Sequence, residues 1–334
     1  MMRRSVALPS RRSIERAVLV AIPAYLVVTL AVATWSGGRA ALANLGRIDP
    51  AVLLLALALV SLHILISAAR WRFLSRPLGV AVGWRDSLVV YAAGFPMMLT
   101  PGRIGELVRP LILKQRHGLS LRRALPVAIG DRVLDLAAIV VIGFVAALAG
   151  AGWPAPAALV AAGLVAALAI AARAGPSRMA ARVVAGLLGR RRRRLAAKLA
   201  EVLRHVRAVL AIGTFLPALA ISIVGWSLEV AAFAAIGAAL GLPLGLADAG
   251  FIFAAAALAG VVLMTPGGVG GSEATMVALL HAGGAPLSVA VLATALLRLA
   301  TLGYAVLVGL VPLAIALRRP SPTALHRSRL QPSA

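Results

Sequence analysis

The chain of 334 residues contains no cysteine, and this absence excludes several kinds of site at once. No disulfide, thiol nucleophile or cysteine-ligated metal can form. The sequence also lacks the spacings of a phosphate-binding loop, a nucleophile elbow and a dinucleotide fingerprint. Its five histidines form no His/Asp/Glu grouping with metal-ligand spacing. These absences predict a protein without a resident metal or cofactor.

Charged residues are scarce, at 13% of the chain, whereas 61% of the residues are hydrophobic. About 20 apolar residues in a helix cross a bilayer core of ~30 Å, and several apolar runs are that long. The runs are continuous rather than alternating, which excludes a transmembrane β-barrel. We predict an all-α fold, a polytopic membrane bundle with six full spans and two broken segments. The spans are 17–35, 51–69, 124–149, 157–172, 214–241 and 287–317, and the broken segments are 86–114 and 250–283.

The net charge of +24 would suit a nucleic-acid-binding protein, but the positions of the basic residues predict a membrane topology instead. If each broken segment enters and leaves on one face, all but six of the 34 lysines and arginines lie in loops and termini on one side. Only Arg39 and Arg47 lie on the other side. If residues 86–114 instead crossed the membrane once, every loop that follows would lie on the opposite side, and the basic residues would no longer gather on one side. Basic loops stay cytoplasmic, so we expect a membrane protein with both termini inside and no nucleic-acid partner.

The two broken segments contain the same kind of corner, 165 positions apart. Residues 100–105 read Thr-Pro-Gly-Arg-Ile-Gly, residues 265–270 read Thr-Pro-Gly-Gly-Val-Gly, and each is followed by an acid, Glu106 or Glu273. Paired interruptions of this kind indicate a transport site between inverted repeats. The expected hinge residues are Pro101, Gly102 and Gly105 in the first corner and Pro266, Gly267 and Gly270 in the second.

The repeat divides a single membrane domain, 1–334, into two halves. The first half is 51–149 and the second is 214–317, and a basic cytoplasmic linker, 173–207, joins them. The linker's arginines either fix the topology or lie on a surface helix with an apolar opposite face. Residues 320–334 are expected to form a disordered tail.

Nine charged residues are predicted at membrane depth. An ionised side chain there costs about 2.5–3.5 kcal/mol, so it should be paired or line a wet cavity. The signs nearly balance, which favours a mutually neutralising cluster. The arginines are Arg103, Arg109, Arg132 and Arg298, and the acids are Glu106, Asp131, Asp135, Glu229 and Glu273.

The first corner is suited to a phosphate. Thr100 and Pro101 can start a helix that presents Arg103, Glu106 and Arg109 on one broad face. Free N–H groups at a helix start, with arginine forks beside them, bind oxyanions. The alternative is that Arg103 or Arg109 extends to the cytoplasmic interface with Glu106 as its partner.

The neighbouring helices contain further candidate pairs. Arg132 and Asp135 are three residues apart, which predicts an ion pair along one helix face, either structural or functional. Ser272 is expected to cap a helix that starts at Glu273, and Arg298 on the next helix offers Glu273 a partner. Glu229 has no obvious local partner, and His63 and His281 are isolated.

Four ordered motifs resemble those of the lysylphosphatidylglycerol synthase transmembrane (flippase-like) family. Residues 101–109 resemble its P-G-R-x-G-E-x-x-R signature, and residues 131–135 resemble its E-R-x-x-D element with Asp131 in place of Glu. Residues 266–273 resemble its P-x-G-x-G-x-x-E element, and Arg298 matches its late arginine. The resemblance covers roughly residues 50–317, and the chain resembles family members that consist of the membrane domain alone.

The resemblance implies a membrane domain that moves a lipid between leaflets. Bifunctional relatives also carry a soluble aminoacyl-transferase domain, which this chain lacks, so lipid lysinylation and other enzymatic activity are not expected. We expect a translocase for a phosphate-bearing envelope lipid, with anionic lipids as partners and possible homo-oligomers. The alternatives are a small-anion transporter or a transferase that uses a polyprenyl-phosphate donor. The expected substrate-binding residues are Arg103, Glu106, Arg109, Arg132, Asp135, Glu273 and Arg298.

Overall fold

The computed structural model describes residues 48–79, 82–99, 108–117, 120–149, 190–263 and 270–317, together with Gly46. All regular secondary structure in these ranges is helical, which confirms the all-α prediction there. The predicted spans 17–35 and 157–172, the tail 320–334 and most of both corners lie outside the described residues.

Within the part of the chain that the structure describes, three helical segments are long and apolar enough to cross a membrane. The first is α3, Pro50–Ser75, extended by the 3-10 turn η1, Arg76–Leu78, and the second is α10, Ile212–Ala239. In the third, α13, Leu287–Arg298, continues through the π-helical turn η5, Leu299–Gly303, into α14, Tyr304–Leu317. A further long helix, α6, Leu121–Leu148, contains the aspartates of the predicted charge cluster. The chain is thus a membrane-embedded helical protein. The predicted helices 51–69, 124–149 and 214–241 are present with shifted bounds, and 287–317 is present with the predicted bounds.

The largest shift is at the end of α3, and it corrects the prediction for Arg70. The helix begins where Asp49 Oδ1 accepts a hydrogen bond from Ala51 N at 2.8 Å, with Pro50 as its first residue. It continues beyond residue 69 because Trp71 and Leu74 are fully buried in the core. Arg70 and Arg72 therefore lie in the helix, not in the cytoplasmic loop predicted at 70–85.

Both segments predicted to be broken consist of separate helices. In the first, α4, Trp84–Ala92, is followed by the 3-10 turn η2, Phe95–Leu99, and then by α5, Val108–His117. In the second, α11, Leu246–Val262, is followed by α12, Gly271–Ala282. The interruptions are confirmed, whereas the re-entrant path and the inverted repeat stay predictions.

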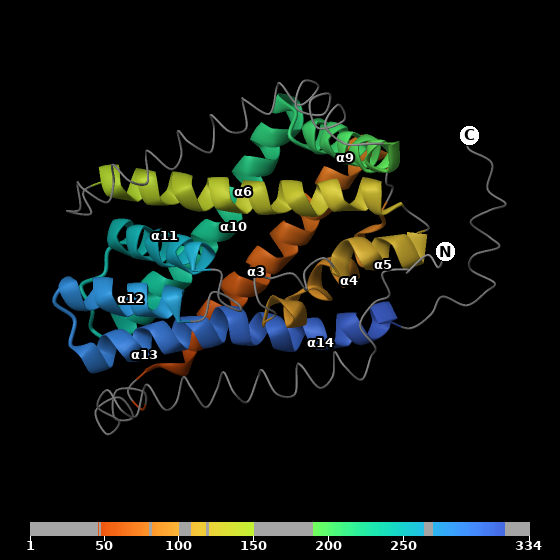
Figure 1. Ribbon diagram of the computed structural model, residues 1–334. Helices are drawn as coiled ribbons and strands as arrows, with labels where there is room; N and C mark the ends of the chain where they lie inside the picture. The colour runs from red at the N-terminus through yellow and green to blue at the C-terminus, as the bar shows by residue number, and fades with distance from the viewer. Residues whose placement is uncertain are drawn as a thin grey trace.

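The described helices form two cores on either side of a central helix pair. In Figure 1, α6 lies along one edge, α13 and α14 lie along the opposite edge, and α3 and α10 run side by side obliquely between them. At one end α4 and α5 pack near α14 around Trp71, Tyr91 and Ile112. At the other end α11 and α12 pack around Phe233 and Phe251. The charged side chains described below lie where these two cores meet.

The second part of the predicted linker is a helix, α9, Arg190–Val209, which packs against α6. Arg122 Nη1 of α6 donates to Glu201 Oε2 at 2.7 Å. This hydrogen bond holds the pKa of the Glu201 carboxyl below its ordinary value. Residues 173–189 of the linker, which include the apolar residues 183–188 that the surface-helix alternative requires, lie outside the described residues.

Candidate functional site

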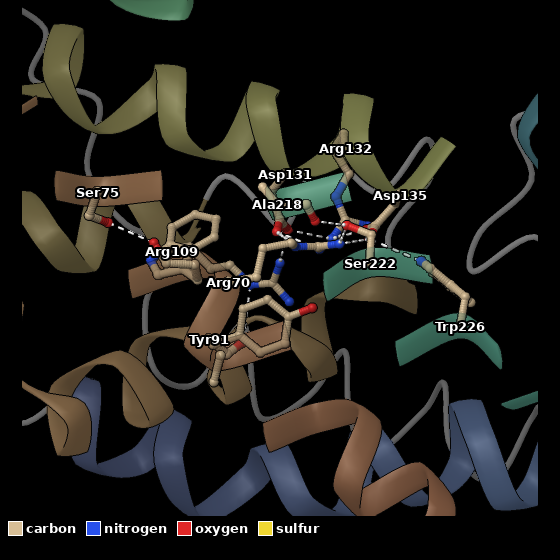
Figure 2. Close-up of polar contacts among 12 residues, drawn as sticks. Arg70, Ser75, Tyr91, Arg109, Asp131, Arg132, Asp135, Ala218, Ser222 and Trp226 are labelled. Atoms are coloured by element: carbon tan, nitrogen blue, oxygen red, sulfur yellow. Dashed lines mark hydrogen bonds and ion pairs between the residues drawn. The ribbon is translucent and has the colours of Figure 1, made fainter. Parts of the chain in front are cut away.

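Arg70 of α3 connects two aspartates of α6 in the interior of the protein. Its Nη2 lies 2.6 Å from Asp131 Oδ1, and its Nη1 lies 2.7 Å from Asp135 Oδ1. Nη1 also donates to Ser222 Oγ of α10 at 2.5 Å, so one guanidinium joins three helices (Figure 2). The Arg70 side chain is 1% exposed and that of Asp131 is 0% exposed, so solvent does not screen this pair.

Arg109 of α5 completes the buried side of this cluster. Its Nε donates to the Tyr91 carbonyl at 3.0 Å, and its Nη1 lies 3.6 Å from Asp131 Oδ2. The guanidinium carbon lies 4.1 Å from the centre of the Tyr91 ring, a cation–π contact. Gly94 is required here, because a Cβ at that position would overlap the Arg109 side chain. The Arg109 side chain is 2% exposed, so the alternative in which it extends to the interface is wrong for this residue.

Arg132 occupies the open side of the same cluster. Its Nη2 lies 2.9 Å from Asp131 Oδ2 and 3.0 Å from Asp135 Oδ2, which confirms the predicted pair with Asp135. Trp226 Nε1 donates to Asp135 Oδ1 at 3.1 Å. The Arg132 side chain is 36% exposed, so among the arginines of this cluster it is the most accessible to a ligand.

The second corner ends in an ion pair between α12 and α13. Glu273 Oε1 accepts from Arg298 Nε at 2.6 Å, as the sequence suggested. Glu273 Oε2 accepts from Gly270 N at 2.6 Å, so the carboxylate caps the helix start. The predicted cap by Ser272 is wrong, because α12 begins at Gly271 and Gly270 is the N-cap residue. Gly270 has a φ of 91°, which favours glycine at this hinge.

Glu229 has a partner that the sequence did not reveal. His63 Nδ1 of α3 lies 2.6 Å from Glu229 Oε1 of α10, and the His63 ring packs against Trp226. His63 is therefore not isolated. In α3, His63, Ser67, Arg70 and Leu74 fall at helical spacing on one face, and that polar stripe could have identified both His63 and Arg70 as inward-facing.

One cavity of about 570 Å³ brings the charged groups of both halves together. Arg109, Arg132 and Asp135 line it from the first half, and Glu229 and Arg298 line it from the second. Glu273 is connected to it through Arg298. The remaining predicted residues, Pro101, Gly102, Arg103, Gly105, Glu106, Pro266 and Gly267, lie outside the described residues.

The described charges in and beside the cavity balance. Four arginines face four carboxylates, and each carboxylate has at least one cationic or imidazole partner. Guanidinium groups are suited to binding oxyanions with two parallel hydrogen bonds. Among the described residues, no three His, Asp or Glu side chains gather as they would around a metal ion. The arginines of this arrangement are suited to binding an anion. The four arginines are Arg70, Arg109, Arg132 and Arg298, and the four acids are Asp131, Asp135, Glu229 and Glu273.

Comparison with known proteins places the chain in one family. No curated protein matches the chain. Residues 18–309 match the family described as the lysylphosphatidylglycerol synthase TM region. The match includes every helix described above except the end of α14, and it contains all the charged residues that line the cavity. This membrane protein therefore belongs to the lysylphosphatidylglycerol synthase transmembrane-region family.

Proposed function

We propose that the protein moves a phosphate-bearing lipid between the two leaflets of the bacterial cytoplasmic membrane. The observation that carries the proposal is the cavity, in which arginines from both halves of the chain face a space large enough for a lipid head group. The family itself is a membrane domain of lipid-related proteins. The proposal involves movement of the lipid only and no chemical change to it.

The head group would bind between Arg132 of α6 and Arg298 of α13. Both side chains line the cavity and retain some exposure, 36% and 15% respectively. Each arginine already contacts a carboxylate, so a phosphate can replace that carboxylate without leaving the guanidinium unpaired. Arg70 and Arg109 are buried, and they would hold the aspartates in place rather than exchange partners.

The acyl chains of the lipid would extend laterally from the cavity into the bilayer. Ile129 of α6 and Val261 of α11 line the cavity and are also 40% and 52% exposed, so the cavity reaches the surface beside them. An apolar rim of this kind suits a hydrocarbon chain and is of no use to a small hydrophilic anion. This feature favours a lipid over the small-anion alternative.

The movement would use the two corners in alternation. In the predicted topology both termini are cytoplasmic, and the corners approach the cavity from opposite faces of the membrane. Gly270 can absorb a change in backbone angle, and the Arg298–Glu273 contact can open as the head group binds. The inverted repeat, with re-entrant segments, is part of this proposal.

The test is lipid transfer in vesicles that contain the purified protein and fluorescent phosphatidylglycerol. A membrane-impermeant reductant bleaches only the outer leaflet, so transfer exposes the inner label. In vesicles with wild-type protein, the reductant should bleach a much larger fraction of the inner-leaflet label than in protein-free vesicles. Arg132→Gln and Arg298→Gln should slow transfer about tenfold or more, because each removes a charge-assisted contact of about 1.5–3 kcal/mol.

The matched control is Arg123→Gln, an exposed arginine on the same helix as Arg132. It should transfer lipid at the wild-type rate. Normal transfer by both cavity variants would rule out the proposed binding site, and no transfer by the wild-type protein would rule out the function for this lipid.

A further inference from the structure

The His63–Glu229 pair is a buried acid–base contact that the proposed head-group site does not use. The two side chains are 9% and 12% exposed, and their 2.6 Å hydrogen bond joins α3 to α10. Both residues line the cavity. Imidazole is the side chain that ordinarily changes its charge between pH 5 and 8, so this pair can exchange a proton where a head group would bind.

The surroundings of His63 hold the ring in place and connect it to the other charges. The Trp226 ring packs on it with centroids 4.8 Å apart, and Trp226 also donates to Asp135. A Cβ at Gly225 would lie 3.0 Å from His63 Cδ2, so the ring edge fits against the backbone of α10. Titratable and charged groups lie in the cavity wall or directly beside it around this pair. Those in the wall are Tyr91 on α4, Arg109 on α5, Arg132 and Asp135 on α6 and Arg298 on α13, and those beside it are Arg70 on α3, Asp131 on α6, Glu273 on α12 and Tyr304 on α14.

The charge balance of the cavity explains why a proton would bind together with an anionic head group. With His63 neutral, the described cavity and its salt bridges contain four positive and four negative groups. A head group with one net negative charge would leave one charge uncompensated at membrane depth, which is unfavourable. A proton on His63 restores neutrality, and the resulting imidazolium already has Glu229 as its partner.

We propose that the His63–Glu229 pair is a proton-binding site that takes up one proton with each anionic head group, so that transfer of an anionic lipid is coupled to proton movement. His63 keeps its Nδ1–H on Glu229 and accepts the incoming proton at Nε2. When the head group leaves on the other side of the membrane, the proton leaves with it. The inference rests on the proposed function and adds its coupling ion.

The test is calorimetry of short-chain phosphatidylglycerol binding to the purified full-length protein in two buffers of different ionisation enthalpy. The difference in heat between the buffers gives the protons taken up per lipid bound. At pH values above the range in which imidazole ordinarily changes its charge, wild-type protein should take up about one proton per phosphatidylglycerol bound. At these pH values the dissociation constant for phosphatidylglycerol should rise about tenfold for each unit by which the pH increases. Short-chain phosphatidylcholine, whose head group has no net charge, should bind without proton uptake.

Two variants should change the affinity for phosphatidylglycerol in opposite directions. His63→Gln keeps a hydrogen-bond donor for Glu229 but cannot take the proton, so binding should weaken about tenfold and lose its pH dependence. Glu229→Gln removes one negative charge, so binding should strengthen and need less proton uptake. If the pair only holds α3 to α10, both variants should weaken binding, and that result would overturn the inference. The exposed Arg123→Gln serves as the control.

The outcomes separate the inference from the proposed function. Binding of phosphatidylglycerol without proton uptake by the wild-type protein would overturn the coupling and leave the proposed function intact. Equal proton uptake by wild type and His63→Gln would show that another group takes the proton and would also overturn the inference. Absence of lipid binding by the wild-type protein would overturn both.

Discussion

The two ion clusters beside the cavity differ in how tightly their partners are fixed. In the first, Arg70 contacts Asp131, Asp135 and Ser222 within 3.1 Å, and its side chain is 1% exposed. In the second, Arg298 contacts Glu273 at 2.6 Å, and the side chains are 15% and 23% exposed. A buried, fully bonded group of charges resists rearrangement, because any change leaves a charge uncompensated. A partly exposed pair can exchange partners, since water or a ligand can replace either one.

This difference assigns the two clusters separate tasks. The first holds α3, α6 and α10 at fixed positions and gives two aspartates a common guanidinium partner beside the cavity. The second lies at the start of α12, directly after a glycine with a φ of 91°. We therefore expect mutations of the buried residues of the first cluster, Arg70 and Asp131, to affect folding. Mutations in the second cluster, and of the more exposed Arg132, should affect transfer.

The largest effect is expected from Arg70→Met. The change leaves Asp131 and Asp135 without their main partner, which should lower the free energy of unfolding by about 3–5 kcal/mol. Thermal unfolding in detergent measures the loss. Arg72→Met on the same helix removes only a hydrogen bond to the Val82 carbonyl and should cost about 1 kcal/mol. If the two variants unfold at the same temperature, the first cluster does not have the proposed structural role.

A second mutation sharpens this result. Asp131→Asn in the Arg70→Met background removes the carboxylate that the first change leaves unpaired. The double variant should therefore lose less stability than the sum of the two single variants. An additive loss would show that the two side chains do not interact in the folded protein.

Glu273→Gln should separate stability from transfer. Its carboxylate is partly exposed, so its loss should cost about 1 kcal/mol of stability or less. Transfer of labelled phosphatidylglycerol in vesicles should nevertheless fall about tenfold, because Arg298 loses the partner with which the head group exchanges. Unfolding and transfer measured on the same preparation give both numbers. A large loss of stability with normal transfer would reverse the assignment of the two clusters.

Trp226→Phe should have a smaller effect at the boundary between the clusters. It removes the hydrogen bond from Nε1 to Asp135 but keeps an aromatic ring against His63. Asp135 keeps Arg70 and Arg132, so the cost should be about 1 kcal/mol. Thermal unfolding measures this cost. Trp84→Phe, at an exposed position on α4, provides the control.

The smallest effect is expected from Glu201→Gln on α9, which belongs to neither cluster. The folded-state pKa of Glu201 lies below its ordinary value of 4.5 because Arg122 donates to it. The stabilisation is therefore present above pH 4.5 and is lost as pH falls through the lower folded-state value. The small difference in melting temperature between wild type and Glu201→Gln should close in acid, and Arg122→Gln should show the same pH dependence. A difference that persists in acid would contradict this origin.

The features that could be predicted from the sequence were local or had a clear compositional signal. The long apolar runs predicted α3, α6, α10 and the α13–α14 segment, and the Gly-Pro corners predicted the breaks in the other helices. Arg132 and Asp135 were paired correctly because three residues along a helix bring two side chains to one face.

Contacts between distant helices could not be predicted in the same way. His63 and Glu229 are 166 positions apart, and nothing near either residue specifies the other. Arg70 was assigned to a loop because Arg72 and Arg76 follow it closely. The burial of Trp71 and Leu74 extends the helix through these residues, and only the packed structure makes that burial evident.

The π-helical turn after Arg298 has a mechanical consequence. The segment on one side of the turn, α13, packs on α12, and the segment on the other side, α14, packs on α4 and η2. At Gly309 the α14 backbone comes so close to the Ala92 carbonyl that a Cβ would lie 2.6 Å from it. If the π-helical turn moved by one residue along the chain, α13 would rotate about its axis relative to α14 by roughly 100°. Such a rotation would change the direction in which Arg298 faces within the cavity while α14 stays fixed to α4.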